Sequence, residues 1–180
     1  MKKILFVLPL VMLLGACAKE AQSQLPSVEE KSYTAKLDPN NSTLTTDDSS
    51  AAIQVEIASN EDSEVKYKFE IGAPCYLKTL SNNLQEIIIK QNAYIKSVSE
   101  YKVDRIIVDF FNGKGVNFNV YANKDGTGDP LEYHESSVAP VYPEDSGKVY
   151  EYAINGNEWS LTNTTNYKPA IYSLSVVFSK

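Results

Sequence analysis

Aromatic side chains are the residues of this chain best suited to hold a ligand. The sequence contains twelve tyrosines and a single tryptophan, Trp159. An aromatic ring can stack on the apolar face of a sugar, and a tyrosine adds a polar tip that can hydrogen-bond. We take Trp159, Tyr133, Tyr142 and Tyr167 as candidate ligand-binding residues, and Tyr150 and Tyr152 lie in or beside the same predicted loops.

Each of these aromatic residues also has a structural alternative. Trp159 and Leu161 fall on the same side of a predicted strand, which favours a place in the core for Trp159. Tyrosine is common in β-strands for reasons of packing. The sequence alone leaves both alternatives open.

The residues for catalysis are sparse. His134 is the only histidine, and no G-x-S-x-G motif accompanies it. One histidine cannot form a metal centre of the usual His and Cys spacing, and no spacing among the 23 acidic residues singles out a carboxylate pair for glycoside hydrolysis. We therefore expect no catalytic residue, no cofactor and no enzymatic activity.

The loop at 123–130 has the composition of a cation-binding turn. Asp125 and Asp129 flank two glycines there, and their carboxylates can bind calcium. The spacing does not fit an EF-hand, and Asp-Gly is also a common hairpin turn. Calcium binding at this loop stays open, and we predict no metal site.

The amino terminus has the layout of an export signal. Lys2 and Lys3 precede an apolar run of 11 residues, 4–14, and the small residues Gly15 and Ala16 follow. This is the pattern of a secretory signal peptide. The run is too short to cross a bilayer, which takes about 20 residues.

Leu14-Gly15-Ala16-Cys17 resembles the lipoprotein box of bacteria. The resemblance implies that residues 1–16 are removed and that Cys17 becomes a lipidated amino terminus bearing more than one acyl chain, as stable anchoring requires. Ala18 and Lys19 offer no aspartate for retention in the inner membrane. The resemblance thus implies a protein of the cell envelope, anchored to either face of the outer membrane.

The charge and cysteine content of the chain after residue 16 limit its possible partners and disulfides. Removal of Lys2 and Lys3 leaves 15 basic and 23 acidic residues, a net charge of −8. Such an acidic chain disfavours nucleic acid as a partner. With Cys17 lipidated, Cys75 has no cysteine partner, so we expect no disulfide. Residues 17–32 are polar and are predicted to be a tether, and 33–180 to be one domain.

The domain is predicted to be all-β. Apolar and polar residues alternate at 53–57 and again at 64–71, which indicates a hairpin, and 103–111 is apolar on both faces, which indicates a central strand. The Asn155-Gly156 turn is expected to join strands at 148–154 and 158–162, and prolines place 138–142 at an edge or in a loop. About ten short strands without helices beyond the signal peptide predict a single β-sandwich. The other expected strands are 84–90, 92–98, 116–122 and 169–179.

The order of segments resembles one family of sandwiches. Ala73-Pro74-Cys75-Tyr76, segments 84–94 and 103–110, and Trp159-Ser160-Leu161-Thr162-Asn163 before 171–178 resemble galactose-binding-like jelly-roll domains of Bacteroidetes lipoproteins. The resemblance spans roughly 110 residues and implies a jelly roll. We expect a membrane-anchored, non-catalytic protein that binds carbohydrate or another cell-surface component. The alternative is a structural or adhesive subunit that contacts envelope proteins through edge strands.

Overall fold

The computed structural model describes residues 30–39, 51–80, 83, 85–113 and 115–180. Cys17, the predicted signal peptide 1–16 and most of the predicted tether lie outside these residues. The described part contains no α-helix, only one turn of 3-10 helix, η1. Its elements are β1 Ser32–Leu37, β2 Ile53–Ala58, β3 Lys66–Gly72, β4 Cys75–Thr79, β5 Gln85–Ile89, β6 Tyr94–Ser97, β7 Lys102–Phe111, β8 Asn119–Tyr121, β9 His134–Glu135, η1 Pro143–Asp145, β10 Gly147–Gly156, β11 Ser160–Thr162 and β12 Ala170–Ser179.

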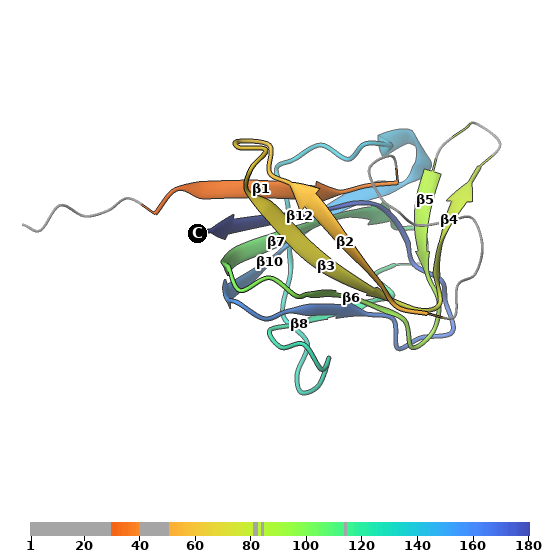
Figure 1. Cartoon of the computed structure of the whole chain (residues 1–180). Coiled ribbons are helices and arrows are strands. Elements are labelled where there is room, and N and C mark those ends of the chain that lie inside the picture. The colour runs from red at the N-terminus through yellow and green to blue at the C-terminus, as the bar shows by residue number, and fades with distance from the viewer. Residues whose placement is uncertain (1–29, 40–50, 81–82, 84, 114) are drawn as a thin grey trace, which may run out of the picture.

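The strands form two antiparallel sheets that pack as a β-sandwich (Figure 1). One sheet has the order β2-β3-β6-β11-β8. The other has the order β4-β5-β12-β7-β10-β9, and β1 also pairs with β12. The predictions of an all-β sandwich and of a central strand at 103–111 are confirmed, since β7 lies between β12 and β10.

Two strands share one edge of β12. β5 pairs with its first residues, Ala170 and Ile171, whereas β1 pairs with the part from Leu174 to Ser179. Ser32 is opposite Ser179, so β1 begins where β12 ends. Figure 1 shows this end of the sandwich opposite the end that carries β4 and β5.

Alternation of side chains explains the hairpin of β2 and β3. Val55, Tyr67 and Phe69 are buried, while Glu56 on the opposite face forms ion pairs with Lys66 at 3.1 Å and Lys68 at 3.3 Å. The register pairs Ile53 with Ile71 and Ala58 with Lys66. The predicted hairpin is confirmed.

Other expectations need correction. β10 and β11 lie in different sheets, so Asn155-Gly156 does not close a hairpin but leads the chain across the sandwich. Of the predicted strand 116–122 only Asn119–Tyr121 pairs. Residues 138–142 form a loop, which was one of the two alternatives predicted for them.

The sequence reasoning also missed three strands: β1, β4 and the two-residue β9. The end of the predicted tether is in contact with the domain. Glu30 accepts a hydrogen bond from Ser179 Oγ at 3.3 Å and lies 3.9 Å from Lys102 Nζ. The folded domain therefore begins before residue 33.

A buried hydrogen-bonded chain links three segments of the five-stranded sheet on its core side. Trp159 Nε1 donates to Tyr67 Oη at 2.9 Å, and Tyr67 Oη donates to Ser97 Oγ at 2.7 Å. The Trp159 ring also meets Phe69 edge-on, with 6.2 Å between centroids. Burial raises the pKa of the Tyr67 hydroxyl. These polar atoms are satisfied inside the core only by one another and by nearby backbone.

We expect Tyr67→Phe to lower the free energy of unfolding by about 1–3 kcal/mol, because it leaves the buried Trp159 N–H without its acceptor. Urea unfolding followed by circular dichroism measures the change. Tyr167→Phe, at an exposed position, is the matched control and should stay within about 0.5 kcal/mol of wild type. Equal stability of both variants would contradict this account of the core.

We expect the Cys75 thiol to be nearly inert in the folded protein. It is buried, and burial raises its pKa to about 12, so thiolate, the reactive form, is scarce at pH 8. A pKa about three units above normal lowers the thiolate fraction roughly a thousandfold. Mass spectrometry of the Cys75 peptide should show slow alkylation by iodoacetamide in buffer and fast alkylation in urea. Similar rates in both would refute the prediction.

Candidate functional site

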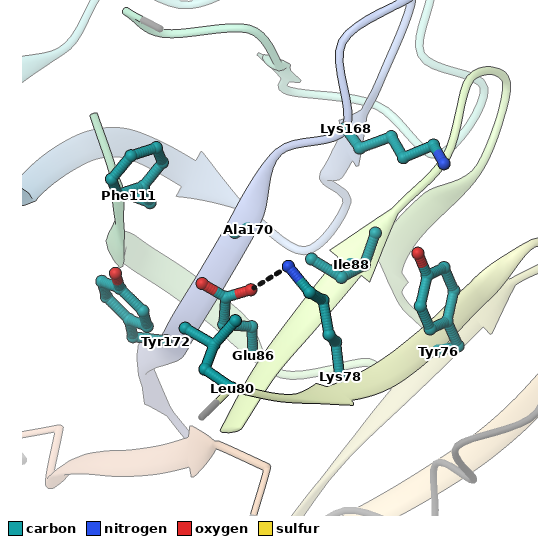
Figure 2. Close-up of a pocket in the computed structure, with 9 residues that line it drawn as sticks. All are labelled: Tyr76, Lys78, Leu80, Glu86, Ile88, Phe111, Lys168, Ala170 and Tyr172. Carbon is teal, nitrogen blue, oxygen red and sulfur yellow. Dashed lines mark ion pairs between the residues drawn. The ribbon is translucent and has the colours of Figure 1, made fainter. Parts of the chain in front are cut away.

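A groove lies on the outer face of the seven-stranded sheet, at the end formed by β4, β5 and the start of β12. It has a volume of about 540 Å³. Figure 2 shows its side chains converging from several segments. The lining residues are Tyr76, Lys78, Leu80, Glu86, Ile88, Phe111, Lys168, Ala170 and Tyr172.

Strand alternation positions the residues of β4 and β5. Cys75, Ile87 and Ile89 point into the core, so the neighbouring residues Tyr76 and Glu86 face outward into the groove. A strand sends successive side chains to opposite faces. The buried face of the two strands thus determines which side chains reach the site.

A β-bulge in β12 positions Tyr172. Ile171 is opposite Phe110, but Ser173, two residues later, is opposite Asp109, the next residue on β7. The extra residue is Tyr172, and a bulge of this kind redirects side chains locally. Ile171 and Leu174 both reach the core, whereas Tyr172 lines the groove.

Aromatic rings form two walls of the groove. Figure 2 shows Phe111 and Tyr172 on one side and Tyr76 on the other. Phe111 is 36% exposed, and Tyr172 is supported edge-on by Tyr142, with 4.8 Å between ring centroids. The amino group of Lys90 lies 5.5 Å from the Tyr76 ring centroid. Neighbouring residues therefore hold both walls in place.

An ion pair lies between the aromatic walls. Lys78 Nζ is 3.7 Å from Glu86 Oε2, and the Glu86 side chain is only 6% exposed while that of Lys78 is 51% exposed. Figure 2 shows the two groups facing each other in the middle of the site, with Lys168 at its rim. Glu86 is the only carboxylate among the described lining residues. The groove thus offers hydrogen-bond donors and an acceptor between apolar rings.

Trp159 does not line the groove. Its side chain is fully buried between the sheets, and its N–H is used by Tyr67. We therefore correct the candidate role of Trp159 as a ligand platform: of the two alternatives, only the core agrees with the structure.

The three candidate tyrosines do not converge. Tyr142 supports the groove through Tyr172. Tyr167, 59% exposed, precedes Lys168 but is not part of the lining. Tyr133, 48% exposed, stacks on Tyr150 at 4.3 Å beside β9 and β10. Only Tyr142 is associated with the site.

The polar candidates lie apart from the groove. His134 is on β9, with its Nε2 3.7 Å from Glu151 Oε2. In the 123–130 loop, Asn123 accepts hydrogen bonds from the backbone N–H groups of Asp125 and Thr127, as a polar turn requires. Within the described residues, no three His, Cys, Asp or Glu side chains gather in a way that could hold a metal ion.

Sequence reasoning missed the main groove residues Tyr76, Phe111 and Tyr172. One signal for Tyr172 was present. The residues of β12 that belong to the core cluster, Ile171, Leu174 and Val176, are spaced three and then two apart, and a change of spacing within a strand indicates a bulge. No comparable signal marks Tyr76 or Phe111, since their role depends on which strands become neighbours.

No helix in the described ranges is long and apolar enough to cross a membrane. Comparisons of this chain with models of protein families, with curated proteins and with solved structures found no match.

Proposed function

We propose that the protein is a non-catalytic lipoprotein of the cell envelope that binds carbohydrate in the outer-face groove. The observation that carries the proposal is the groove itself, in which the rings of Tyr76, Phe111 and Tyr172 surround the Lys78–Glu86 ion pair. Binding sites for small molecules are commonly apolar and aromatic, with a few placed polar groups. Sugars match this combination because they have apolar faces and hydroxyl edges.

The lining chemistry favours binding over hydrolysis. Glycoside hydrolysis generally uses two carboxyl groups on either side of the bond that breaks. The described lining residues supply one carboxylate, Glu86, and Lys78 is its ion-pair partner. A jelly-roll topology remains part of the proposal, supported by the two-sheet antiparallel arrangement.

The placement of the groove suits a protein held by its amino terminus. β1 begins beside Ser179, at the far end of β12 from Ala170 and Tyr172. Ten residues of β12 extend about 30 Å at roughly 3.3 Å each. A chain tethered through Cys17 would therefore present the groove away from the membrane, at the outer membrane as the lipoprotein box implies.

The alternative, a structural subunit that pairs through an edge strand near Val141, has less support. The Val141 N–H donates to Asp109 Oδ2 at 2.7 Å and is not free to pair with another chain. Strand addition needs unpaired backbone groups along an edge.

We expect Tyr76→Ala to weaken carbohydrate binding about tenfold, since a central aromatic anchor is commonly worth more than 1 kcal/mol. A glycan array identifies binders, and calorimetry gives the affinities. Tyr133→Ala is the matched control, because Tyr133 is also exposed but lies beside Tyr150 of β10, away from the groove. Equal losses in both variants, or none in Tyr76→Ala, would count against the groove.

We expect Cys17→Ser to abolish membrane anchoring, because the proposed acyl chains are attached to that thiol. In detergent phase partition and labelling with an alkyne fatty acid, wild type should enter the detergent phase and carry label. Cys75→Ser is the matched control and should behave as wild type. A labelled, membrane-bound Cys17→Ser variant would exclude the proposed anchor.

A further inference from the structure

A second hollow, of about 290 Å³, lies on the same outer face. Its floor comes from four neighbouring strands, β10, β7, β12 and β1. Its roof is the loop at 136–142, which we call the strap, and which runs from β9 to η1. In Figure 1 the strap belongs to the cyan and light-blue trace along the top of the view. The strap contributes Val138, Ala139 and Val141 to the hollow.

The floor of this hollow contains a buried carboxylate that is only half satisfied. Asp109 is 4% exposed. Its Oδ2 accepts the Val141 N–H at 2.7 Å, but its Oδ1 has no hydrogen-bond partner among the described residues. Buried polar atoms are nearly always paired, and one that is not calls for an explanation. Burial also raises the pKa of this carboxyl.

The surroundings of Asp109 indicate what kind of donor fits. Lys36 and Arg105 line the same hollow, and Arg105 also pairs with Glu151 at 3.4 Å. Two nearby cations disfavour a cationic ligand, and the carboxylate disfavours an anionic one. A neutral ligand with hydroxyl groups fits both, because a hydroxyl donates to the carboxylate and accepts from the cations.

The rest of the lining suits a sugar ring. Ser173 and Ser175 bring hydroxyls from β12, and Ile107 and Val149 bring apolar surface from β7 and β10. The bulge that turns Tyr172 outward also turns Ser173 outward, since both lie between the core residues Ile171 and Leu174. One backbone irregularity therefore shapes both hollows.

A smaller hollow of about 220 Å³ lies between the two. It shares Tyr172 with the groove, and Lys36 and Val141 with the strap hollow. Asn83 and Gln85 add amide groups to its wall. It occupies the place where β1 ends and β5 begins along the edge of β12. The three hollows thus follow one another across the sheet.

We propose that the ligand of this face is a neutral oligosaccharide, one sugar of which occupies the groove while a later sugar lies in the strap hollow and donates a hydroxyl to Asp109 Oδ1. The inference rests on the proposed carbohydrate binding in the groove. Beyond that proposal, it states that the ligand has more than one sugar and that Asp109 Oδ1 accepts a hydrogen bond from it.

The test is a glycan array that carries neutral saccharide series from one to six sugars, with calorimetry on the members that bind. Wild-type affinity should rise with length beyond two sugars. Asp109→Asn should lower the affinity for the longer members about tenfold, a factor equal to about 1.4 kcal/mol, and leave the shorter members unchanged. Asparagine keeps an acceptor for the Val141 N–H, so the strap retains its contact.

A second variant guards against an ambiguous result. Ser175→Phe places a ring on the floor of the strap hollow and should cause the same length-dependent loss. Tyr133→Ala is the control, and thermal melting verifies that each variant is folded.

The outcomes separate the two proposals. Binding that is lost in Tyr76→Ala but is independent of length, or insensitive to Asp109→Asn at every length, would overturn the oligosaccharide inference alone. Absence of wild-type binding to every saccharide would overturn the proposed function as well.

Discussion

The outer face of the sandwich depends on the bulge at Tyr172. Without it, strict alternation along β12 would place either Ile171 or Leu174 outside the core, although both are buried. The extra residue lets both point inward and leaves Tyr172 and Ser173 as neighbours on the opposite face. At the same point the partner on the edge of β12 changes from β5 to β1. Core packing, sheet pairing and the shape of the groove therefore share one cause.

The two faces of the seven-stranded sheet are covered by different parts of the chain. One face packs against the five-stranded sheet through large aliphatic and aromatic side chains. On the other, the strap covers the middle of the sheet and is fixed there by the Asp109–Val141 hydrogen bond and the Tyr142–Tyr172 contact. The strap ends where η1 returns the chain to β10, with Gly147 N–H bonded to the Tyr142 carbonyl. The strap hollow lies beneath this cover, and the groove lies beside it.

Local alternation was sufficient to predict the sandwich and the β2–β3 hairpin, because each of these strands has a distinct buried and exposed side. β4 was missed because only Cys75 and Leu77 mark its inner face. The Asn155-Gly156 turn was recognised, and Asn155 does adopt a positive φ of 52°. Turn chemistry specifies a bend, however, and not the sheet that the next strand joins. The groove could not be predicted, since Tyr76, Phe111 and Tyr172 come together only through the order of strands in space.

The pairing of β1 with β12 has a consequence for the order of events during synthesis. β12 is the last strand of the described residues, yet it lies between β7 on one edge and β5 with β1 on the other. Until β12 has emerged, β1 and the β4–β5 pair lack the strand that joins them to β7, and contacts between distant segments form slowly. The seven-stranded sheet therefore closes only after the ten residues of β12 are in place.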